Sequence, residues 1–213
     1  TYTAKFTKTV SRLFSTNDFK TLLNKVENDG ITTYKCDQIT AVHFVDLTDY
    51  DLTSVTYSDY SASGDGSVKA WMDGTELYIG GYGKIIAGSS LVYAFRTGEK
   101  INSMTGFEML DTSNVTDMSQ MFQSCGNHST EFTLDLGNNF NTSNVTRMKD
   151  MFEGCGREST KFTLNLGDNF DTSNVYDMSG LFHNCGYNST VFALDLGEKF
   201  DTSNVINMSD MFN

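Results

Sequence analysis

The stretch NTSNVTRMKDMFEGCGRESTKFTLNLGDNF, residues 141–170, decides the fold because nearly the same pattern recurs before and after it. Its TSNV tetrapeptide starts at Thr112, Thr142, Thr172 and Thr202, so the period is 30 residues. Self-similarity at a fixed period of roughly 20–50 residues is typical of solenoids and propellers. A unit this short cannot bury its apolar face alone, so stacked units are expected to share one continuous core.

Each unit contains two apolar patterns. The first is carried by Val145, Met148, Phe152 and Cys155, which are spaced as on one face of a helix. In the second, residues 162–166 alternate between apolar and polar, as in a strand with one buried face. Together they predict an α/β fold, namely a leucine-rich-repeat-like right-handed solenoid of 30-residue strand–helix units with parallel strands.

The repeat also carries a resemblance to a known family. The segments TSNVTDMSQMFQSC and TSNVTRMKDMFEGC are similar to the repeats of BspA-like surface proteins, the DUF285 group of bacteria and mycoplasmas. Upstream, GDGSVKAW and TELYIG (residues 64–71 and 75–80) resemble the part that precedes such repeats. The resemblance implies an extracellular, bacterial cell-surface protein that acts in adhesion or in binding host proteins or glycans.

Two domains are expected. Residues 1–88 are predicted to form a small α+β N-terminal cap, and residues 89–213 the solenoid, which stops within its last repeat. The cap is expected to contain helices over 4–14 and 16–30, a strand over 39–45 and a hairpin around Asp73 and Gly74. Such a cap would cover the first coil of the solenoid.

Composition excludes several classes of partner. Lys and Arg total 15 and Asp and Glu total 27, giving a net charge of −12, so nucleic acid and anionic membrane surfaces are disfavoured. No apolar run approaches the roughly 18 residues that a membrane-spanning helix needs. We therefore predict neither nucleic-acid binding nor membrane insertion of this segment.

The repeated cysteines are candidates for chemistry. Cys125, Cys155 and Cys185 occupy an apolar position of the repeat and are expected about 5 Å apart on neighbouring coils. Three residues in one column cannot all pair, so buried free thiols are predicted, with a disulfide or a reactive thiol as the alternative. Cys36 stands outside the repeat.

Two columns of Asp and Asn residues also recur. They comprise Asp111, Asn141, Asp171 and Asp201, together with Asn114, Asn144, Asn174 and Asn204. Turn and capping roles are predicted for them, and oxygen ligation of calcium is the alternative. No CxxC pair or histidine spacing predicts a metal site, and no cofactor is predicted.

Catalysis has little support in the sequence. Carboxylates are abundant, among them Asp117, Asp135, Asp177 and Asp195, but none has a catalytic spacing to His or Lys. The chain contains no GxSxG, HExxH or phosphate-binding loop motif. A non-enzymatic protein is predicted, and a surface glycan hydrolase remains an alternative, which would need two carboxylates about 5–10 Å apart in one cleft.

The outward strand positions are the predicted binding surface. They form a grid of Glu131, Thr133 and Asp135; Lys161, Thr163 and Asn165; and Val191, Ala193 and Asp195. These positions vary between repeats while the inward ones stay fixed, which suits a recognition surface and equally fits drift on an unused one. A rival patch comprises Tyr176, Tyr187 and Ile206.

Two further expectations concern partners. A structural spacer that presents another domain is the alternative to a binding protein. Apolar residues near the end of the chain, including Val205, Met208, Met211 and Phe212, predict self-association through an open C-terminal end of the solenoid.

Overall fold

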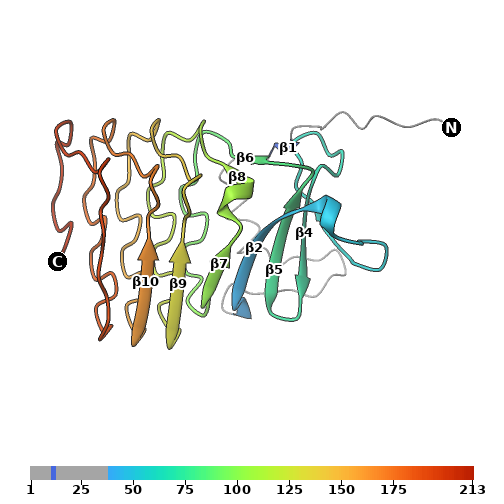
Figure 1. Cartoon of the computed structure of the whole chain (residues 1–213), viewed down its shortest axis with the longest axis horizontal. Coiled ribbons are helices and arrows are strands. Elements are labelled where there is room, and N and C mark those ends of the chain that lie inside the picture. The colour runs from blue at the N-terminus through green and yellow to red at the C-terminus, as the bar shows by residue number, and fades with distance from the viewer. Residues whose placement is uncertain (1–10, 13–37) are drawn as a thin grey trace.

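A computed structural model of the chain describes residues 11–12 and 38–213 (Figure 1). Figure 1 shows coils stacked side by side along the long axis, with strands arranged in a row across one face. The main sheet has seven strands in the order β10-β9-β7-β2-β5-β4-β3. Their bounds are Ala41–Asp46 (β2), Ser58–Asp59 (β3), Val68–Asp73 (β4), Glu76–Gly81 (β5), Ser103–Thr105 (β7), Glu131–Asp135 (β9) and Lys161–Asn165 (β10).

A smaller sheet runs along a second side of the stack. It contains three parallel strands in the order β1-β6-β8, spanning Ser11–Arg12, Ile85–Ile86 and Leu110–Asp111. Short 3₁₀ turns lie at Leu47–Asp49 (η2) and Phe107–Met109 (η3). No helix in the described part of the chain is long and apolar enough to cross a membrane.

The solenoid and its parallel strands are confirmed. Strands β9 and β10 pair in parallel with an offset of 30 residues, from Lys161 opposite Glu131 to Asn165 opposite Asp135. The alternation within each strand places Phe132 and Leu134 in the core and the intervening side chains in solvent. The repeat period read from the sequence is therefore the distance along the chain from one coil to the next.

The helix predicted in each unit is wrong, because this segment forms consecutive tight turns. Met121 N donates to Met118 O at 3.2 Å within the coil, whereas Phe122 N donates to Met151 O of the next coil at 2.9 Å. Gln120 has a φ of 58°, in the left-handed region that a helix does not use. Alternate N–H groups bond to the neighbouring coil, so the i→i−4 pattern of an α-helix does not form.

The turn segment still buries the residues that a helix would have buried. Spacings of three and four suit a run of turns as well as a helix face, so the apolar pattern misled the prediction of local structure. Phenylalanine rings stack along the solenoid, with centroid distances of 5.6 Å for Phe95–Phe122 and Phe122–Phe152 and 5.5 Å for Phe152–Phe182 and Phe182–Phe212. This column forms the middle of the core.

The strand predicted in the last coil does not form. Residues 191–195 carry no strand assignment, and Phe192 and Leu194 are only half-buried. Phe192 still stacks on Phe162 at 5.0 Å, but the N–H of Phe162 bonds to the Ser189 hydroxyl at 3.1 Å and not to a backbone carbonyl of residues 191–195.

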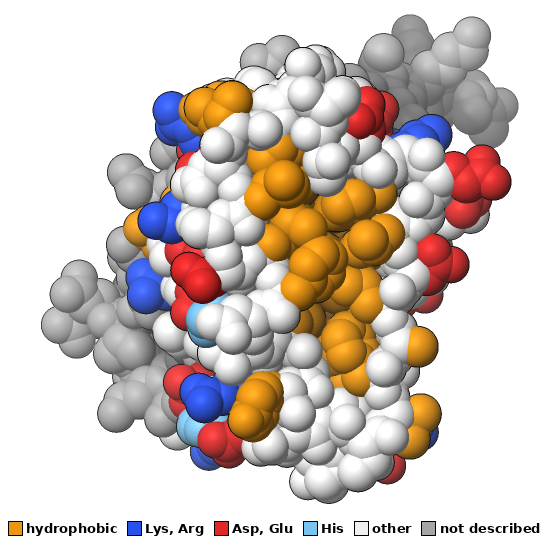
Figure 2. All heavy atoms as spheres, turned by 90° about the vertical axis from the view of Figure 1, so that its left-hand side faces the viewer, with side chains coloured by type: hydrophobic (Ala, Val, Ile, Leu, Met, Phe, Trp, Pro, Cys, Tyr) orange, Lys and Arg blue, Asp and Glu red, His pale blue; other side chains and the backbone are white. Residues whose placement is uncertain are grey.

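Figure 2 views this end of the molecule, where hydrophobic side chains gather at the centre. A hollow of about 380 Å³ is lined there by Phe182, Cys185, Phe192, Leu194 and Phe212, among others.

The N-terminal region extends the sheet of the solenoid. The predicted hairpin is confirmed, since β4 and β5 are antiparallel and Asp73 pairs with Glu76 across its turn. Strand β2 pairs in parallel with both β5 and β7, so the sheet runs without interruption into the coils. An α+β cap is not supported, because residues 38–88 of the described chain contain strands and a 3₁₀ turn but no α-helix. The helix predicted over 4–14 is contradicted at Ser11–Arg12, which form strand β1 and pair with β6. The rest of that range and the helix predicted over 16–30 lie outside the described residues.

Candidate functional site

The predicted grid is built mainly by β9 and β10. Glu131, Thr133 and Asp135 are exposed, as are Lys161, Thr163 and Asn165 on the next coil. Two contacts link the rows: Lys161 Nζ lies 3.5 Å from Glu131 Oε2, and Asn165 Nδ2 donates to Asp135 Oδ1 at 2.9 Å. Of the two carboxylates in these rows, Glu131 is paired with an ammonium and Asp135 with a neutral amide, so this part of the face is polar and slightly acidic.

The third row of the grid has a different structure from the other two. Val191, Ala193 and Asp195 are exposed, and Val191 is 71% accessible. Their segment is not hydrogen-bonded to β10 as a strand, so the row is not held in the backbone register of the others. The structure therefore brings six of the nine predicted residues into one ordered array.

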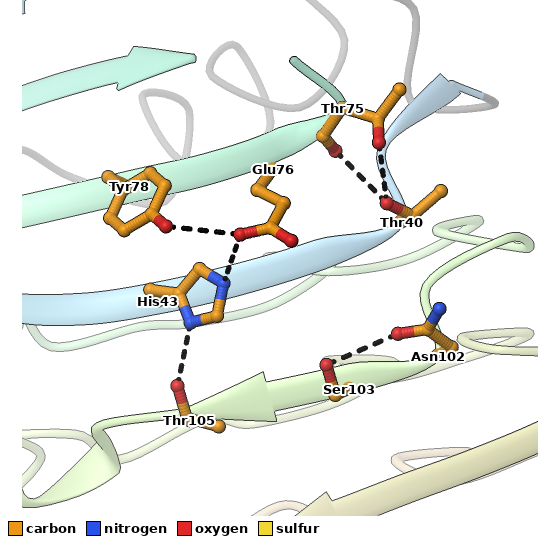
Figure 3. Close-up of polar contacts among 8 residues, drawn as sticks. All are labelled: Thr40, His43, Thr75, Glu76, Tyr78, Asn102, Ser103 and Thr105. Atoms are coloured by element: carbon orange, nitrogen blue, oxygen red, sulfur yellow. Dashed lines mark hydrogen bonds and ion pairs between the residues drawn. The ribbon is translucent and has the colours of Figure 1, made fainter. Parts of the chain in front are cut away.

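The same face continues over β7, β2 and β5, which the sequence analysis did not include. Figure 3 shows His43 between side chains from the two neighbouring strands. His43 Nδ1 lies 2.8 Å from Thr105 Oγ1, and His43 Nε2 lies 3.2 Å from Glu76 Oε2. Tyr78 Oη donates to the same carboxylate oxygen at 3.0 Å. Burial raises the pKa of Tyr78, and the hydrogen bond to Glu76 raises it further.

Stacked rings fill the N-terminal part of this face. The ring centroids of Trp71 and Tyr78 lie 5.3 Å apart, and those of Tyr78 and His43 lie 4.7 Å apart. Tyr50 packs on Trp71 at 5.4 Å, and Trp71 is buried. The rings cover one another, so this cluster stabilises the outward face and leaves mainly polar edges for recognition.

A cleft lies where β2, β7 and β9 begin. Its volume is about 630 Å³, and it is lined by Thr40, Lys100, Asn102, His128, Ser129, Thr130, Glu131 and Thr133. Only Glu131 and Thr133 were among the residues predicted from the sequence. The others lie outside the strand alternation, so no signal in a single repeat pointed to them.

Comparison with known proteins identifies the family. A family model described as "Mycoplasma protein of unknown function, DUF285" matches residues 89–213, more than half of the chain. The chain belongs to the DUF285 family. The resemblance stated from the TSNV repeats is thereby confirmed. No curated protein and no solved structure matches the chain.

One of the two Asp and Asn columns of the DUF285 repeats has the turn role predicted for it, and the other bonds to backbone carbonyls of the preceding coil. Asp171 Oδ1 accepts from Ser173 N at 2.9 Å, and Asn174 Nδ2 donates to Ser143 O of the preceding coil at 2.7 Å. Equivalent bonds recur at Asp111, Asn141 and Asp201 and at Asn144 and Asn204. Among the residues that the structure describes, no group of three or more His, Cys, Asp or Glu side chains is placed to hold a metal ion.

The threonine in the middle of each of these turns links two coils from the inside. Thr142 is fully buried, and its hydroxyl donates to Asp171 O at 2.8 Å and accepts from Asp171 N at 2.7 Å. Thr112 and Thr172 repeat this exchange with the coils that follow them. The invariance of TSNV therefore has a structural cause, since the hydroxyl satisfies two backbone groups of the next coil.

The cysteine column of the DUF285 repeats is also structural. Cys125, Cys155 and Cys185 are buried free thiols, as predicted. Burial raises the pKa of Cys155 well above its usual range, and the neighbouring thiol of Cys185 adds to the effect. A thiol in this state is a poor nucleophile, so the column packs the core. Cys36 lies outside the described residues.

In the rival patch, Tyr176 and Ile206 lie on neighbouring coils, where Ile206 N donates to Tyr176 O at 2.9 Å. Tyr187 and Ile206 are exposed, whereas Tyr176 is hydrogen-bonded to the Nε of Arg147. The carboxylates of Asp117 and Asp177 accept hydrogen bonds from backbone N–H groups two residues later, as in Asx turns. These two carboxylates therefore satisfy backbone groups within the coils.

Proposed function

We propose that this DUF285 protein is a non-enzymatic bacterial cell-surface protein that binds a host or neighbouring-cell protein or glycan through its outward sheet face. The matching family is described only as one of unknown function. The surface location and adhesion are proposed from the resemblance to BspA-like surface proteins, and the outward sheet face is chosen from the geometry of this chain. Adhesion by such a protein would use many weak contacts over a broad, pre-formed surface. An extracellular location at the cell surface is part of the same proposal.

One observation supports this proposal: inward strand positions keep the same residues from coil to coil, whereas outward positions vary more. Phe162 and Leu164 are buried at the same positions as Phe132 and Leu134. Of the three outward positions, the first and third differ between the two coils, and the middle one is threonine in both. The strands repeat with a constant offset of 30, so the outward side chains are held in a fixed array. A rigid frame with substitutable outward residues lowers the entropy cost of binding.

The test is binding of the folded chain to an array of extracellular matrix proteins and glycans. The charge-reversal variant E131K/K161E/D195K is measured beside the parent, with circular dichroism to confirm that it folds. Loss of binding in the variant supports the outward face as the recognition surface. Equal binding by both proteins would move the site to the turn side of the coils and contradict the proposal.

A spacer that presents another domain is the second candidate. The observation in its favour is that successive coils add in one direction with the same register, which lengthens the molecule without changing its cross-section (Figure 1). A folded chain that binds nothing on the array would favour the spacer over adhesion.

A further inference from the structure

The cleft on the outward face originates from a mismatch in length between two coils. Gly126 N donates to Gly98 O at 2.9 Å, and Thr133 N donates to Asn102 O at 3.0 Å. Between these two bonds the second coil advances seven residues, whereas the first advances four. The second coil is therefore three residues longer than the first in this interval, although His128 N and the Ser129 hydroxyl within it still bond to Glu99 O and Ile101 O.

This mismatch is confined to one boundary between coils. Between the second and third coils the offset stays at 30, both where the Ser159 hydroxyl donates to Ser129 O at 2.6 Å and where Thr163 pairs with Thr133. The cleft is thus a local feature of the place where the regular repeat begins. No single repeat predicts it, because it depends on comparing two coils.

The walls of the cleft are held in place by contacts outside it. His128 lies between two carboxylates, with Nδ1 3.1 Å from Glu99 Oε2 and Nε2 3.7 Å from Glu158 Oε2. The buried Ser129 hydroxyl donates to Ile101 O at 2.9 Å. On the opposite side, the hydroxyls of Thr40 and Thr75 are 2.7 Å apart (Figure 3). These contacts pre-organise the cleft before any ligand enters.

The lining consists of small polar groups. Hydroxyls come from Thr40, Thr130 and Thr133, an amide from Asn102, an imidazole from His128, an ammonium from Lys100 and a carboxylate from Glu131. The Ser129 hydroxyl also lines the cleft but is already bonded to Ile101 O. Hydroxyls and amides both donate and accept hydrogen bonds. Such a set complements a ligand that also presents groups able to do both, as the hydroxyls of a sugar do.

Charge and shape narrow the choice of ligand. Glu131 is paired with Lys161, and the chain as a whole carries a charge of −12, which disfavours a polyanion. The strands beneath the cleft pair with each other, so they offer no free edge to which a peptide strand could add. A volume of about 630 Å³ falls within the range of small-ligand sites, roughly 300–1,000 Å³.

We propose that this cleft binds a short, uncharged oligosaccharide. The proposal rests on the proposed function, because it names a ligand class for part of the same outward face. Binding is expected to be weak at a single cleft, since the cleft is open to solvent on one side and contacts are hydrogen bonds exchanged with water. Presentation of many copies on a surface would raise the apparent affinity.

The test uses the folded 213-residue chain and an array of neutral oligosaccharides, with sialylated and sulfated ones alongside. The variant T130V/T133V removes two hydroxyls from the cleft while keeping the branched side-chain shape. The matched control is T163V, which removes the equivalent hydroxyl one coil further on, outside the cleft. We expect neutral sugars to bind the parent and T163V equally and T130V/T133V at least about fivefold more weakly.

Three results would overturn the proposal. They are no binding of neutral sugars by the folded parent, equal binding by both valine variants, or a preference for acidic sugars that K100Q abolishes. The variant K161E/D195K, which leaves the cleft lining unchanged, separates this proposal from the broader one. If it loses a protein partner but keeps the sugar, two sites share the face. If K161E/D195K still binds the protein partner while T130V/T133V loses the sugar, the oligosaccharide site is supported and the strand grid is excluded as the protein-binding surface.

Discussion

The segments 161–165 and 191–195 share one sequence pattern but differ in structure. The first is strand β10, with Phe162 only 1% exposed, whereas the second forms no strand and its Phe192 is half-buried. Strand β10 has β9 on one side and the Phe192 layer on the other, while residues 191–195 have a neighbouring coil on one side only. The comparison shows that the alternating pattern determines which side of the segment is buried. Formation of the strand also requires a neighbouring coil on both sides.

The largest difference between covered and uncovered coils is expected in the phenylalanine column. Phe152 stacks between Phe122 and Phe182 and is fully buried, so Phe152→Ala is expected to cost about 3–5 kcal/mol. Phe212 stacks on one ring and is 58% exposed, so Phe212→Ala is expected to cost about 1 kcal/mol. Urea unfolding of both variants is the measurement. Equal losses would mean that the last coil is as well packed as the inner ones.

The glycines that end the strands give a second comparison. A Cβ at Gly167 would lie 2.2 Å from Gly137 O, whereas a Cβ at Gly137 or Gly197 would meet nothing within 4 Å. All three have positive φ, which costs alanine about 1–2 kcal/mol. Gly167→Ala adds a backbone collision, so we expect about 3 kcal/mol or more for it.

Thermal unfolding of the three alanine variants checks this order. Gly137→Ala is the matched control for left-handed strain without a collision. Should Gly197→Ala prove as damaging as Gly167→Ala, the last coil would be packed on its neighbour in solution as closely as the inner coils are.

The uncovered coil is also expected to associate with a second copy of the chain. Met208 and Phe212 of the last coil are exposed, and Phe212 lines a hollow together with Phe182, Phe192 and Leu194. Exposed apolar faces of this kind favour association. Sedimentation velocity over a concentration series should show a dimer or larger species, and the variant M208S/F212S should shift it toward monomer. A parent that remains monomeric at high concentration would contradict an open end that acts this way.

The smallest expected effect concerns acid stability at matched turns of the first and last TSNV coils. Burial raises the pKa of Asp111, but hydrogen bonds from Ser113 and the charge of Lys84 outweigh it, so the pKa is lowered. A backbone hydrogen bond from Ser203 lowers the pKa of Asp201. Stability from a lowered pKa is present above the usual value of about 3.9 and is lost as the pH falls through the folded value.

Melting curves at pH 6 and pH 3 test this effect. Asp111→Asn keeps the side-chain oxygen that accepts from Ser113, as Asn141 does naturally in the next coil. The variant lacks the stability that ionised Asp111 contributes, so it should be slightly less stable than the parent at pH 6 and should lose less stability than the parent between pH 6 and pH 3. An equal loss in both would show that Asp111 does not contribute to acid unfolding.

Several features of the fold were predictable because they depend on residues close in sequence. Alternation over 162–166 correctly assigned the buried side of β10, and Asp73 with Gly74 correctly marked the hairpin. The turn role of the column that contains Asp111 and Asn141 followed from local hydrogen bonds to the backbone two residues later. The second Asn column instead bonds to backbone carbonyls of the preceding coil. Buried free thiols followed from an apolar position repeated three times.

The helix in each unit was predicted wrongly because the hydrogen bonds that replace it are made with residues far away in the sequence. The competing partner of Phe122 N is Met151 O, 29 residues later in the sequence.

The exposed site residues of β9 and β10 were predictable from alternation, but the cluster of His43, Glu76 and Thr105 was not. His43 and Thr105 are 62 residues apart in sequence, and only the pairing of β2 with β7 brings them together.

The sequence of this DUF285 protein determined the period, the stacking of coils and the side of each strand that faces the core. All three follow from apolar residues recurring at fixed short spacings. The tertiary structure decided the form of the turn segment, the state of the last coil and the position of the cleft. Each depends on which backbone groups of one coil form hydrogen bonds with those of the next. These contacts join residues about 30 positions apart, so the residues of a single repeat do not specify them.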